Sequence, residues 1–345
     1  MSSGKTIFVT GGAGFIGSAF VRFARDGGYR VFILDKLTYA GNRDNLEGVL
    51  EPGLCELVVG DIGDADFVSS VLRSNEVSAV VNLAAETHVD NSITYPQPFI
   101  DTNVTATLIL LRTCHEYFVS LPANRAQDFV VLHVSTDEVF GSLSATGSFT
   151  EDSCYAPRSP YAASKAAGDH LVQAWSHTYG LPTIITYCGN NFGPRQHREK
   201  LIPNMIASAL TGSGMPVYGN GMNVRDWIYV EDHCEALMLA LEKGTRGESY
   251  CFGGSNEWTN IDLVRRLCVL LDQREPRGDG TSYAEQIAFV SDRPGHDFRY
   301  ALDWRKAATN LGYAPRTEFD DALSQTIDWY LAHRERLQLT EGASA

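Results

Sequence analysis

A glycine-rich turn near the start of the chain constrains the fold more than any other feature. The apolar segment 6–10 runs into Gly11-Gly12-Ala13-Gly14-Phe15-Ile16-Gly17. These glycines fit both G-x-G-x-x-G and G-x-x-G-x-x-G spacing between a strand and a helix. Without Cβ atoms the backbone turns tightly and approaches a pyrophosphate, which the N–H groups at the helix start can hold. We therefore expect a dinucleotide site that includes Gly11, Gly14 and Gly17. The spacing alone leaves open a glycine turn that binds nothing.

Two carboxylates follow the glycine turn at strand ends and narrow the choice of ligand. Asp35 ends the second expected strand, where a carboxylate accepts hydrogen bonds from ribose hydroxyls and repels a 2′-phosphate. NAD is therefore favoured over NADP. Asp61 ends the third strand. Either residue could merely begin a turn, but with the glycines they outline an adenosine pocket.

The first half of the chain alternates short apolar runs with amphipathic stretches. Strands are expected at 6–10, 30–34, 56–59, 79–83 and 129–134, and helices at 15–25, 101–118 and 160–179. This succession predicts an α/β fold with a doubly wound parallel sheet of the Rossmann type.

Beyond about residue 190 the composition of the chain changes, because glycine and proline become frequent. We expect a NAD-binding domain over residues 1–190, completed by parts of 223–260. A smaller α+β substrate-binding domain is expected over 191–335, followed by a tail at 336–345.

The helix expected at 160–179 carries a reactive pair. Ser159 and Pro160 are typical of a helix start, and Gly180 is typical of a helix end. Tyr161 and Lys165 then lie one turn apart on one face. A cation near the phenol is expected to lower its pKa, so that Tyr161 can take a proton from a hydroxyl group. Taken alone, the pair could also be a coincidence on a solvated helix face.

The strand at 129–134 delivers Thr136, Asp137 and Glu138 to the carboxyl edge of the sheet, where such folds bind ligands. Tyrosine and lysine suffice to oxidise an alcohol. The adjacent Asp137 and Glu138 add an acid and a base, which the removal of water from a sugar requires. The alternative is that Asp137 caps a helix and Glu138 lies in solvent.

Composition excludes several classes of protein. With 28 Lys and Arg against 42 Asp and Glu, the net charge is −14, which disfavours non-specific binding to nucleic acid or to membranes. We expect neither a membrane span nor a leader for secretion, since no long apolar run occurs. The seven cysteines are scattered without a C-x-x-C pair, which indicates reduced thiols, a cytoplasmic location and no metal site.

Motifs along nearly the whole chain resemble those of the extended short-chain dehydrogenase/reductases and, within them, the dTDP-glucose 4,6-dehydratase family. In the first half they are TGGAGFIGS at 10–18, DKLTYAGN at 35–42, GDI at 60–62, LAAETHVDNSI at 83–93, STDEVFG at 135–141 and YAASKA at 161–166. In the second half they are NNFGPRQ at 190–196, EKLIP at 199–203, NVRDWIYVEDH at 223–233 and DRPGHDFRYALD at 292–303.

The resemblance implies a reaction that regenerates its own cofactor. Tyr161, supported by Lys165 and Thr136, would deprotonate the glucose 4-hydroxyl as NAD takes the C4 hydride. Glu138 would then remove the C5 proton while Asp137 protonates the departing 6-hydroxyl. Return of the hydride to C6 would give a nucleotide-linked 4-keto-6-deoxyglucose.

The resemblance also implies binding residues. Those expected to contact NAD, besides the glycines, are Phe15, Ile16, Asp35, Lys36, Leu37, Thr38, Asp61, Ile62, Leu83, Ala84, Ala85, Thr87, Thr102, Tyr161, Lys165 and Asn191. Those expected to contact the nucleotide sugar are Thr87, His88, Thr136, Asn190, Lys200, Leu201, Pro216, Tyr218, Arg225, Asn260, Arg293 and His296. The two arginines suit diphosphate oxygens, although each has a neighbouring aspartate with which it could form a surface ion pair.

Four residues depart from the commoner family pattern. Thr87 replaces serine, Asn91 replaces arginine, and Phe140 and Phe192 replace tyrosines. None of these changes removes a proposed catalytic group, but each phenylalanine lacks a hydroxyl and Asn91 lacks a positive charge.

Alternative functions stay open at this point. They are a 4,6-dehydratase acting on UDP-glucose or another nucleotide sugar, a nucleotide-sugar 4-epimerase, and a non-catalytic NAD-binding regulator. An epimerase would not need the Asp137-Glu138 pair. A non-catalytic regulator would be expected to have lost some of the reactive residues, whereas this chain has all of them. The resemblance further implies a homodimer formed through the helices at 101–118 and 160–179.

Overall fold

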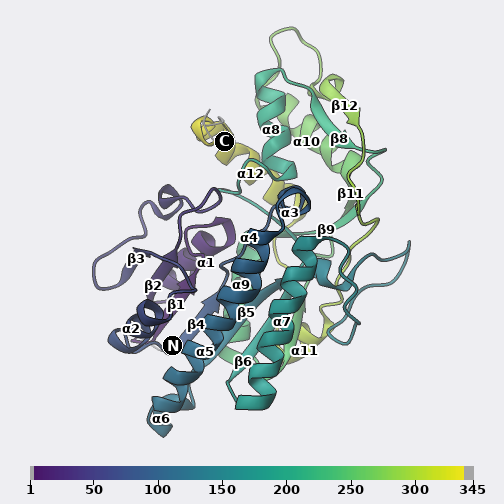
Figure 1. Ribbon diagram of the computed structural model, residues 1–345. Coiled ribbons are helices and arrows are strands. Elements are labelled where there is room, and N and C mark those ends of the chain that lie inside the picture. Colours follow the sequence, from purple (N-terminus) through teal and green to yellow (C-terminus); the bar gives the residue numbers. More distant parts are fainter. Residues whose placement is uncertain (1–3, 338–345) are drawn as a thin grey trace.

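The computed structural model describes residues 4–337. Its centre is a seven-stranded sheet in the order β10-β6-β5-β4-β1-β2-β3 (Figure 1). Every pairing in this sheet is parallel. The strands are β1 (Thr6–Thr10), β2 (Arg30–Asp35), β3 (Cys55–Val59), β4 (Ala79–Asn82), β5 (Val130–Thr136), β6 (Thr183–Cys188) and β10 (Ser249–Phe252). The predicted doubly wound parallel sheet is confirmed.

Helices cover both faces of the sheet because its strands are apolar on both sides. In β1, Ile7 and Val9 belong to one core, and Phe8 belongs to the other. The first core includes α1 (Phe15–Asp26) and α9 (Val230–Lys243), which pack together. The second includes α2 (Ala65–Ser74), α5 (Thr107–Ser120) and α7 (Pro160–Tyr179), and Figure 1 shows α5 beside α7. This alternation is the period-two pattern of a strand buried on both faces.

Several element boundaries differ from the sequence expectation. The helix predicted over 101–118 is not one regular α-helix, because Asp101–Ala106 forms a π-helical turn, η2, before α5 begins. Within this turn Asn103 bonds to the backbone of Glu86 and to Ser164, contacts that no periodic pattern encodes. The strand predicted at 129–134 instead covers Val130–Thr136. Helix α7 has its predicted bounds.

The remaining chain forms smaller sheets at one end of the molecule (Figure 1). One is a three-stranded sheet of β11 (Glu257–Thr259), β9 (Val224–Tyr229) and β7 (Asn190–Phe192). The other pairs β12 (Ile287–Val290) with β8 (Met215–Tyr218). The helices of this part include α8 (Leu201–Thr211), α10 (Asn260–Arg274) and α12 (Phe319–Ala332).

The predicted domain division stays a prediction. Strand β10, from within the predicted segment 223–260, extends the large sheet beside β6. Of the predicted tail, residues 338–345 lie outside the described chain, whereas Leu337 is buried at the end of η5 (Arg334–Leu337).

The other short elements connect these layers. They are η1 (Arg43–Leu46), α3 (Val89–Thr94), α4 (Gln97–Ile100), α6 (Ala123–Ala126), η3 (Asp137–Phe140), η4 (Tyr283–Gln286) and α11 (Arg305–Leu311).

Candidate active site

A cavity of about 320 Å³ lies at the carboxyl edge of the large sheet, where β1, β2, β4, β5 and β6 end. Its walls include every residue predicted to contact NAD except Leu37. This is the edge at which doubly wound sheets bind their ligands.

The glycine turn at the floor of the cavity admits no side chains. Gly11 has a φ of +70°, and a Cβ there would lie 2.7 Å from the Ala84 nitrogen. A Cβ on Gly17 would lie 2.1 Å from the Gly11 carbonyl oxygen. Gly14 precedes α1 and supplies no side-chain cap, so the helix leaves its first N–H groups for a ligand. The predicted pyrophosphate cradle is thus present, and its shape fits NAD.

Asp35 is held in place by the turn that follows β2. Its carboxylate accepts hydrogen bonds from the backbone N–H groups of Ala13 and Leu37, both at 2.8 Å. Leu37 thus helps to orient Asp35 and is not part of the cavity wall, so its predicted contact with NAD stays a prediction. Nearby, Lys36 forms a 2.7 Å ion pair with Asp61. Asp35, Lys36 and Asp61 thus lie together on the cavity wall, and their contact with adenosine stays a prediction.

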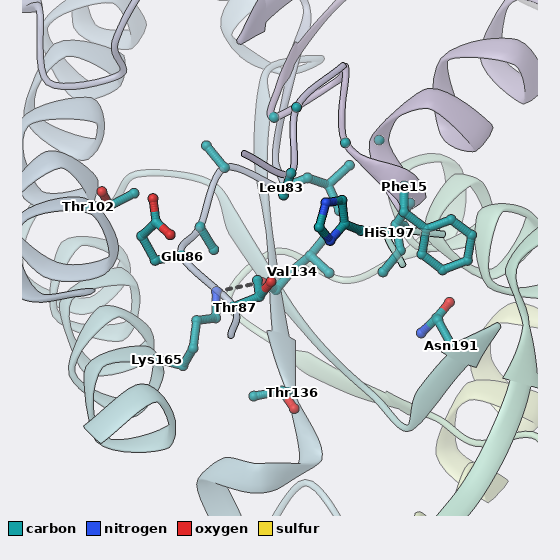
Figure 2. A pocket seen from close by; sticks show the side chains of 18 of the residues that line it. Phe15, Leu83, Glu86, Thr87, Thr102, Val134, Thr136, Lys165, Asn191 and His197 are labelled. Carbon is teal, nitrogen blue, oxygen red and sulfur yellow. Dashed lines mark hydrogen bonds between the residues drawn. The ribbon is translucent and has the colours of Figure 1, made fainter. Parts of the chain in front are cut away.

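The reactive pair on α7 is buried against β5. The Lys165 ammonium donates a hydrogen bond to the Val134 carbonyl oxygen at 2.8 Å (Figure 2). Tyr161 is 8% exposed and lies beside Thr136. Burial, together with the charge of Glu138, raises the pKa of Tyr161 well above its usual value. The expected lowering of this pKa by Lys165 is therefore wrong for the cavity as it stands, because desolvation outweighs the attraction of a cation tied to the strand.

Asp137 and Glu138 follow β5 in the short turn η3. Thr136, not Asp137, caps this turn, by accepting a hydrogen bond from the Glu138 N–H at 3.3 Å. The Thr136 hydroxyl donates to Asp137 at 3.2 Å. The alternative in which Asp137 caps a helix and Glu138 lies in solvent is thus not what the structure shows, since Asp137 is 2% exposed and Glu138 lines the cavity.

The two carboxyl groups have different electrostatic surroundings. Burial and the neighbouring Glu138 raise the pKa of Asp137 well above its usual value, which favours the protonated acid. Burial also raises the pKa of Glu138, but the positive charges of Arg293 and Arg225 oppose that rise. This difference in surroundings agrees with the predicted roles, Asp137 as the acid and Glu138 as the base, which stay predictions.

The residues predicted to bind the nucleotide sugar fall into two groups. Thr87, Thr136, Asn190 and Lys200 line the cavity. Outside its wall lie His88, Leu201, Pro216, Tyr218, Arg225, Asn260, Arg293 and His296. Most of this second group belongs to the smaller sheets and their helices. Two of them, Arg225 and Arg293, nevertheless act on Glu138 through their charges, as does Lys200 of the first group.

Neither predicted diphosphate arginine is an ion pair with its neighbouring aspartate within residues 4–337. Arg225 is 5% exposed, and its guanidinium donates to the Asp297 carbonyl oxygen at 3.0 Å and lies 4.3 Å from the Tyr300 ring centre. The Arg293 guanidinium pairs with Asp90 at 3.4 Å. Asp292 instead contacts His296 at 2.7 Å. Both arginines are thus fixed by tertiary contacts.

Several residues of the cavity wall were not anticipated from the sequence. They include Glu86, Val89, Cys188, Gln196 and His197. Figure 2 shows Glu86 near Thr102 and His197 near Phe15. Glu86 lies inside a motif that carried the family resemblance, so its position was a usable signal. Gln196 closes another such motif, but no pattern marks His197.

The fold and the site together define a NAD-dependent enzyme of the extended short-chain dehydrogenase/reductase class. Comparisons with known proteins specify the family. The family model described as GDP-mannose 4,6 dehydratase matches residues 8–326. The dTDP-glucose 4,6-dehydratase of Xanthomonas campestris pv. campestris strain B100 is 52% identical over 333 residues, covering 96% of this chain and 95% of the relative. dTDP-glucose 4,6-dehydratase 1 of Escherichia coli K12 is 47% identical over 337 residues, covering 95% and 93%. The chain belongs to this dehydratase family.

Solved structures agree with the sequence relatives. DesIV, a dTDP-glucose 4,6-dehydratase from Streptomyces venezuelae with NAD and TYD bound, superposes with a TM-score of 0.87. It is 44% identical, and the match covers 96% of this chain and all of DesIV. A UDP-glucose 4-epimerase from Thermotoga maritima reaches 0.83 at 26% identity, covering 95% and 99%. The fold is thus shared with epimerases, while the higher identity lies with the dehydratases.

Proposed function

We propose that this protein converts dTDP-glucose to dTDP-4-keto-6-deoxyglucose, as a hydro-lyase that uses bound NAD. The observation that carries the proposal is the placement of Asp137 and Glu138 on the cavity that also holds Tyr161 and Lys165. An epimerase needs only Tyr161 and Lys165, whereas the elimination of water also needs an acid and a base such as Asp137 and Glu138. Close relatives named as dTDP-glucose 4,6-dehydratases support this choice.

Each side chain has a definite task in the proposed reaction. Bound NAD supplies a hydride acceptor, then a hydride donor, and a positive ring that favours the Tyr161 phenolate. Tyr161 takes the 4-hydroxyl proton, and the resulting C4 ketone acidifies the C5 proton. Glu138 removes that proton, and Asp137 gives its own proton to the 6-hydroxyl, which leaves as water. With the hydride returned to C6, a proton would return to C5, so the reaction would lose water without net oxidation or reduction of the sugar nucleotide.

The charge distribution supports a nucleotide diphosphate as the rest of the substrate. Arg225, Arg293 and Lys200 all act on Glu138, so positive charge is concentrated beside the catalytic turn of a chain whose net charge is −14. Arginine forks and a lysine suit diphosphate oxygens. This local charge accounts for anion binding by an acidic protein.

Purified protein supplied separately with dTDP-glucose and UDP-glucose in deuterated water tests the proposal. Mass spectrometry should show a 4-keto-6-deoxy product from dTDP-glucose, with one solvent deuterium at C5. Faster turnover of UDP-glucose would move the assignment to the uridine sugar, since one methyl group gives only about 1–3 kcal/mol of discrimination. Formation of dTDP-galactose without loss of water would refute the dehydratase assignment.

A homodimer is part of the proposal. The segment from α4 to α5 and the end of α7 expose large apolar side chains, namely Ile100 at 43%, Leu108 at 37%, Val119 at 64% and Tyr179 at 50%. Pairing of these helices with a second copy would remove this surface from water. Light scattering at micromolar concentration should give twice the monomer mass of 37.9 kDa, and a monomer there would end this part of the proposal.

A cytoplasmic location is also proposed. It is supported by the seven cysteines, all of which are free thiols. Among residues 4–337, no helix has the length and apolarity needed to cross a bilayer.

A further inference from the structure

Three loops meet across the cavity, and each comes from a different part of the chain. They follow β2 (residues 36–42), β4 (residues 83–88) and β7 (residues 193–200). Each loop lines the cavity, the first through Thr38, the second through Thr87 and the third through His197. The loops therefore enclose the same space, although no secondary structure joins them.

The Glu199 carboxylate contacts residues of two of these loops. Its carboxylate lies 3.6 Å from Nε2 of His88 in the second loop and 3.4 Å from Nδ1 of His197 in its own loop. The Lys200 ammonium lies 3.5 Å from its other oxygen. The Glu199 side chain is only 12% exposed, so these interactions are screened less than surface ion pairs are.

Further contacts bring in the remaining loop. The Tyr39 ring of the first loop packs edge-on against His197, with 5.7 Å between ring centres. The Tyr39 phenol also lies close to Thr87. Lys200 donates to the Thr87 carbonyl oxygen at 3.0 Å. Each loop thus contacts the other two, and we call Tyr39, Thr87, His88, His197, Glu199 and Lys200 the clasp.

The clasp lies over the middle of the NAD site. The glycine turn holds the pyrophosphate, Asp35 marks the adenosine ribose, and Tyr161 marks the reactive end. Figure 2 shows His197 beside Phe15 at the start of α1, with Leu83 close by. A cofactor on the glycine turn would therefore lie between α1 and the clasp.

We propose that Glu199 is a cofactor-retaining residue, whose contacts hold the clasp closed over NAD between turnovers. The inference rests on the proposed function, in which the hydride returns to the sugar and NAD never needs to leave. A dehydrogenase that exchanges its cofactor in every turnover would be slowed by such a closure. A redox-neutral cycle is not slowed, and retention protects the transient reduced cofactor from loss.

Exchange of bound NAD tests the role of Glu199. Glu199→Gln keeps the size of the side chain but removes the charge that His88, His197 and Lys200 share. Pre-loaded holoenzyme is mixed with excess isotopically labelled NAD, and exchange is followed by rapid filtration and mass spectrometry. Loss of one charged contact predicts exchange faster by about tenfold or more in this variant. The matched control is Glu235→Gln. Glu235 forms a 2.9 Å ion pair with Arg316, and neither residue lines the cavity, so loss of this charge should leave the exchange of NAD unchanged.

A second variant removes a clasp contact made by a different loop. It distinguishes a loss of NAD retention from a folding defect of the first variant. Tyr39 is 41% exposed, so Tyr39→Ala should fold, and it too should exchange NAD faster. In both variants, added NAD should restore the activity that is lost when the holoenzyme is diluted, because the defect lies in retention. Wild-type exchange in both variants would overturn the clasp. A wild-type protein that neither carries nor binds NAD would instead overturn the proposed function.

Discussion

Two adjacent carboxyl groups carry the specificity of the chemistry at the scale of single residues. Among residues 4–337, Asp137 has only Thr136 as a side-chain hydrogen-bond donor and is buried beside another acid, so it favours the protonated form. Glu138 lines the cavity, and the positive charges of Arg293, Arg225 and Lys200 act to lower its pKa. Different surroundings thus suit two neighbouring carboxyl groups to the proposed roles of acid and base.

Substitution of Glu138 separates oxidation from elimination. Glu138→Gln keeps Tyr161 and Lys165, so single-turnover mixing with dTDP-glucose should still produce NADH absorbance. Loss of the base should slow exchange of the C5 proton with deuterated water by about 10²–10⁴-fold. Asp137→Asn provides the contrast, because it should exchange at C5 and fail to expel water. Normal C5 exchange by Glu138→Gln would refute the assignment of the base.

Buried His233 predicts a pH dependence of stability. It is fully buried, its Nδ1 donates to Asn191 at 2.9 Å, and burial lowers its pKa from 6.5 to about 3. Between these values the unfolded chain binds a proton that the folded chain refuses, so stability falls as the pH falls below 6.5. The contribution is about 1.4 kcal/mol per pH unit at most.

Urea unfolding of wild type and His233→Gln between pH 4.5 and 7 measures this contribution. The variant should show a shallower loss of unfolding free energy toward low pH, since glutamine does not titrate. His177→Gln, at an exposed position of α7, is the control and should keep the wild-type slope. Equal slopes for His233→Gln and wild type would contradict the prediction.

At the scale of elements, the close approach of α7 to the π-helical turn η2 fixes the site. A Cβ on Gly168 would lie 2.8 Å from the Asn103 carbonyl oxygen. The Asn103 side chain in turn bonds to Ser164 on α7 and to the backbone of Glu86 at the cavity. Glycine at 168 therefore lets one helix carry Tyr161 and Lys165 while it supports the loop after β4.

Gly168→Ala should push α7 away from η2. Overpacking of this kind costs about 1–3 kcal/mol in the free energy of unfolding, although alanine has the better helix propensity. Urea unfolding measures the change. Gly278→Ala is the matched control, because no atom lies within 4 Å of its Cβ, and its effect should stay within about 0.5 kcal/mol. A more stable Gly168→Ala variant would show that the contact relaxes easily.

At the scale of the whole molecule, the sheet separates two cores that bury nearly all the thiols. Cys55, Cys234 and Cys268 belong to the core with α1 and α9, and Cys114 and Cys251 belong to the other. Cys188 is 7% exposed at the cavity, and burial raises its pKa to about 12. Cys154 is exposed. Thiol reactivity therefore reports the integrity of both cores.

Ellman's reagent should label one thiol per chain quickly in the native protein and all seven in urea. The physical reason is that a buried thiol rarely becomes a thiolate, which is the reactive form. Cys154→Ser should abolish the fast phase and leave the slow one. A fast phase of two or more thiols in the native protein would contradict the burial of Cys188 or of a core cysteine.

The local signals of the chain determined the fold class and predicted the residues proposed to be catalytic. The glycine turn, the ends of α7 and the acidic pair after β5 depend on backbone geometry within a few residues, so spacing alone reveals them. Strand alternation likewise specified a parallel sheet with two covered faces. The family resemblance supplied the distant nucleotide-binding residues, which local spacing does not reveal.

Only the tertiary structure decided which surroundings each residue has. The raised pKa of Tyr161, the pairing of Arg293 with Asp90 and the meeting of Glu199 with His88 all depend on segments far apart in sequence. Burial and charge proximity set these properties, and both arise after the chain has closed its long-range contacts. The sequence therefore determined what chemistry is available, and folding decided its protonation state and its enclosure.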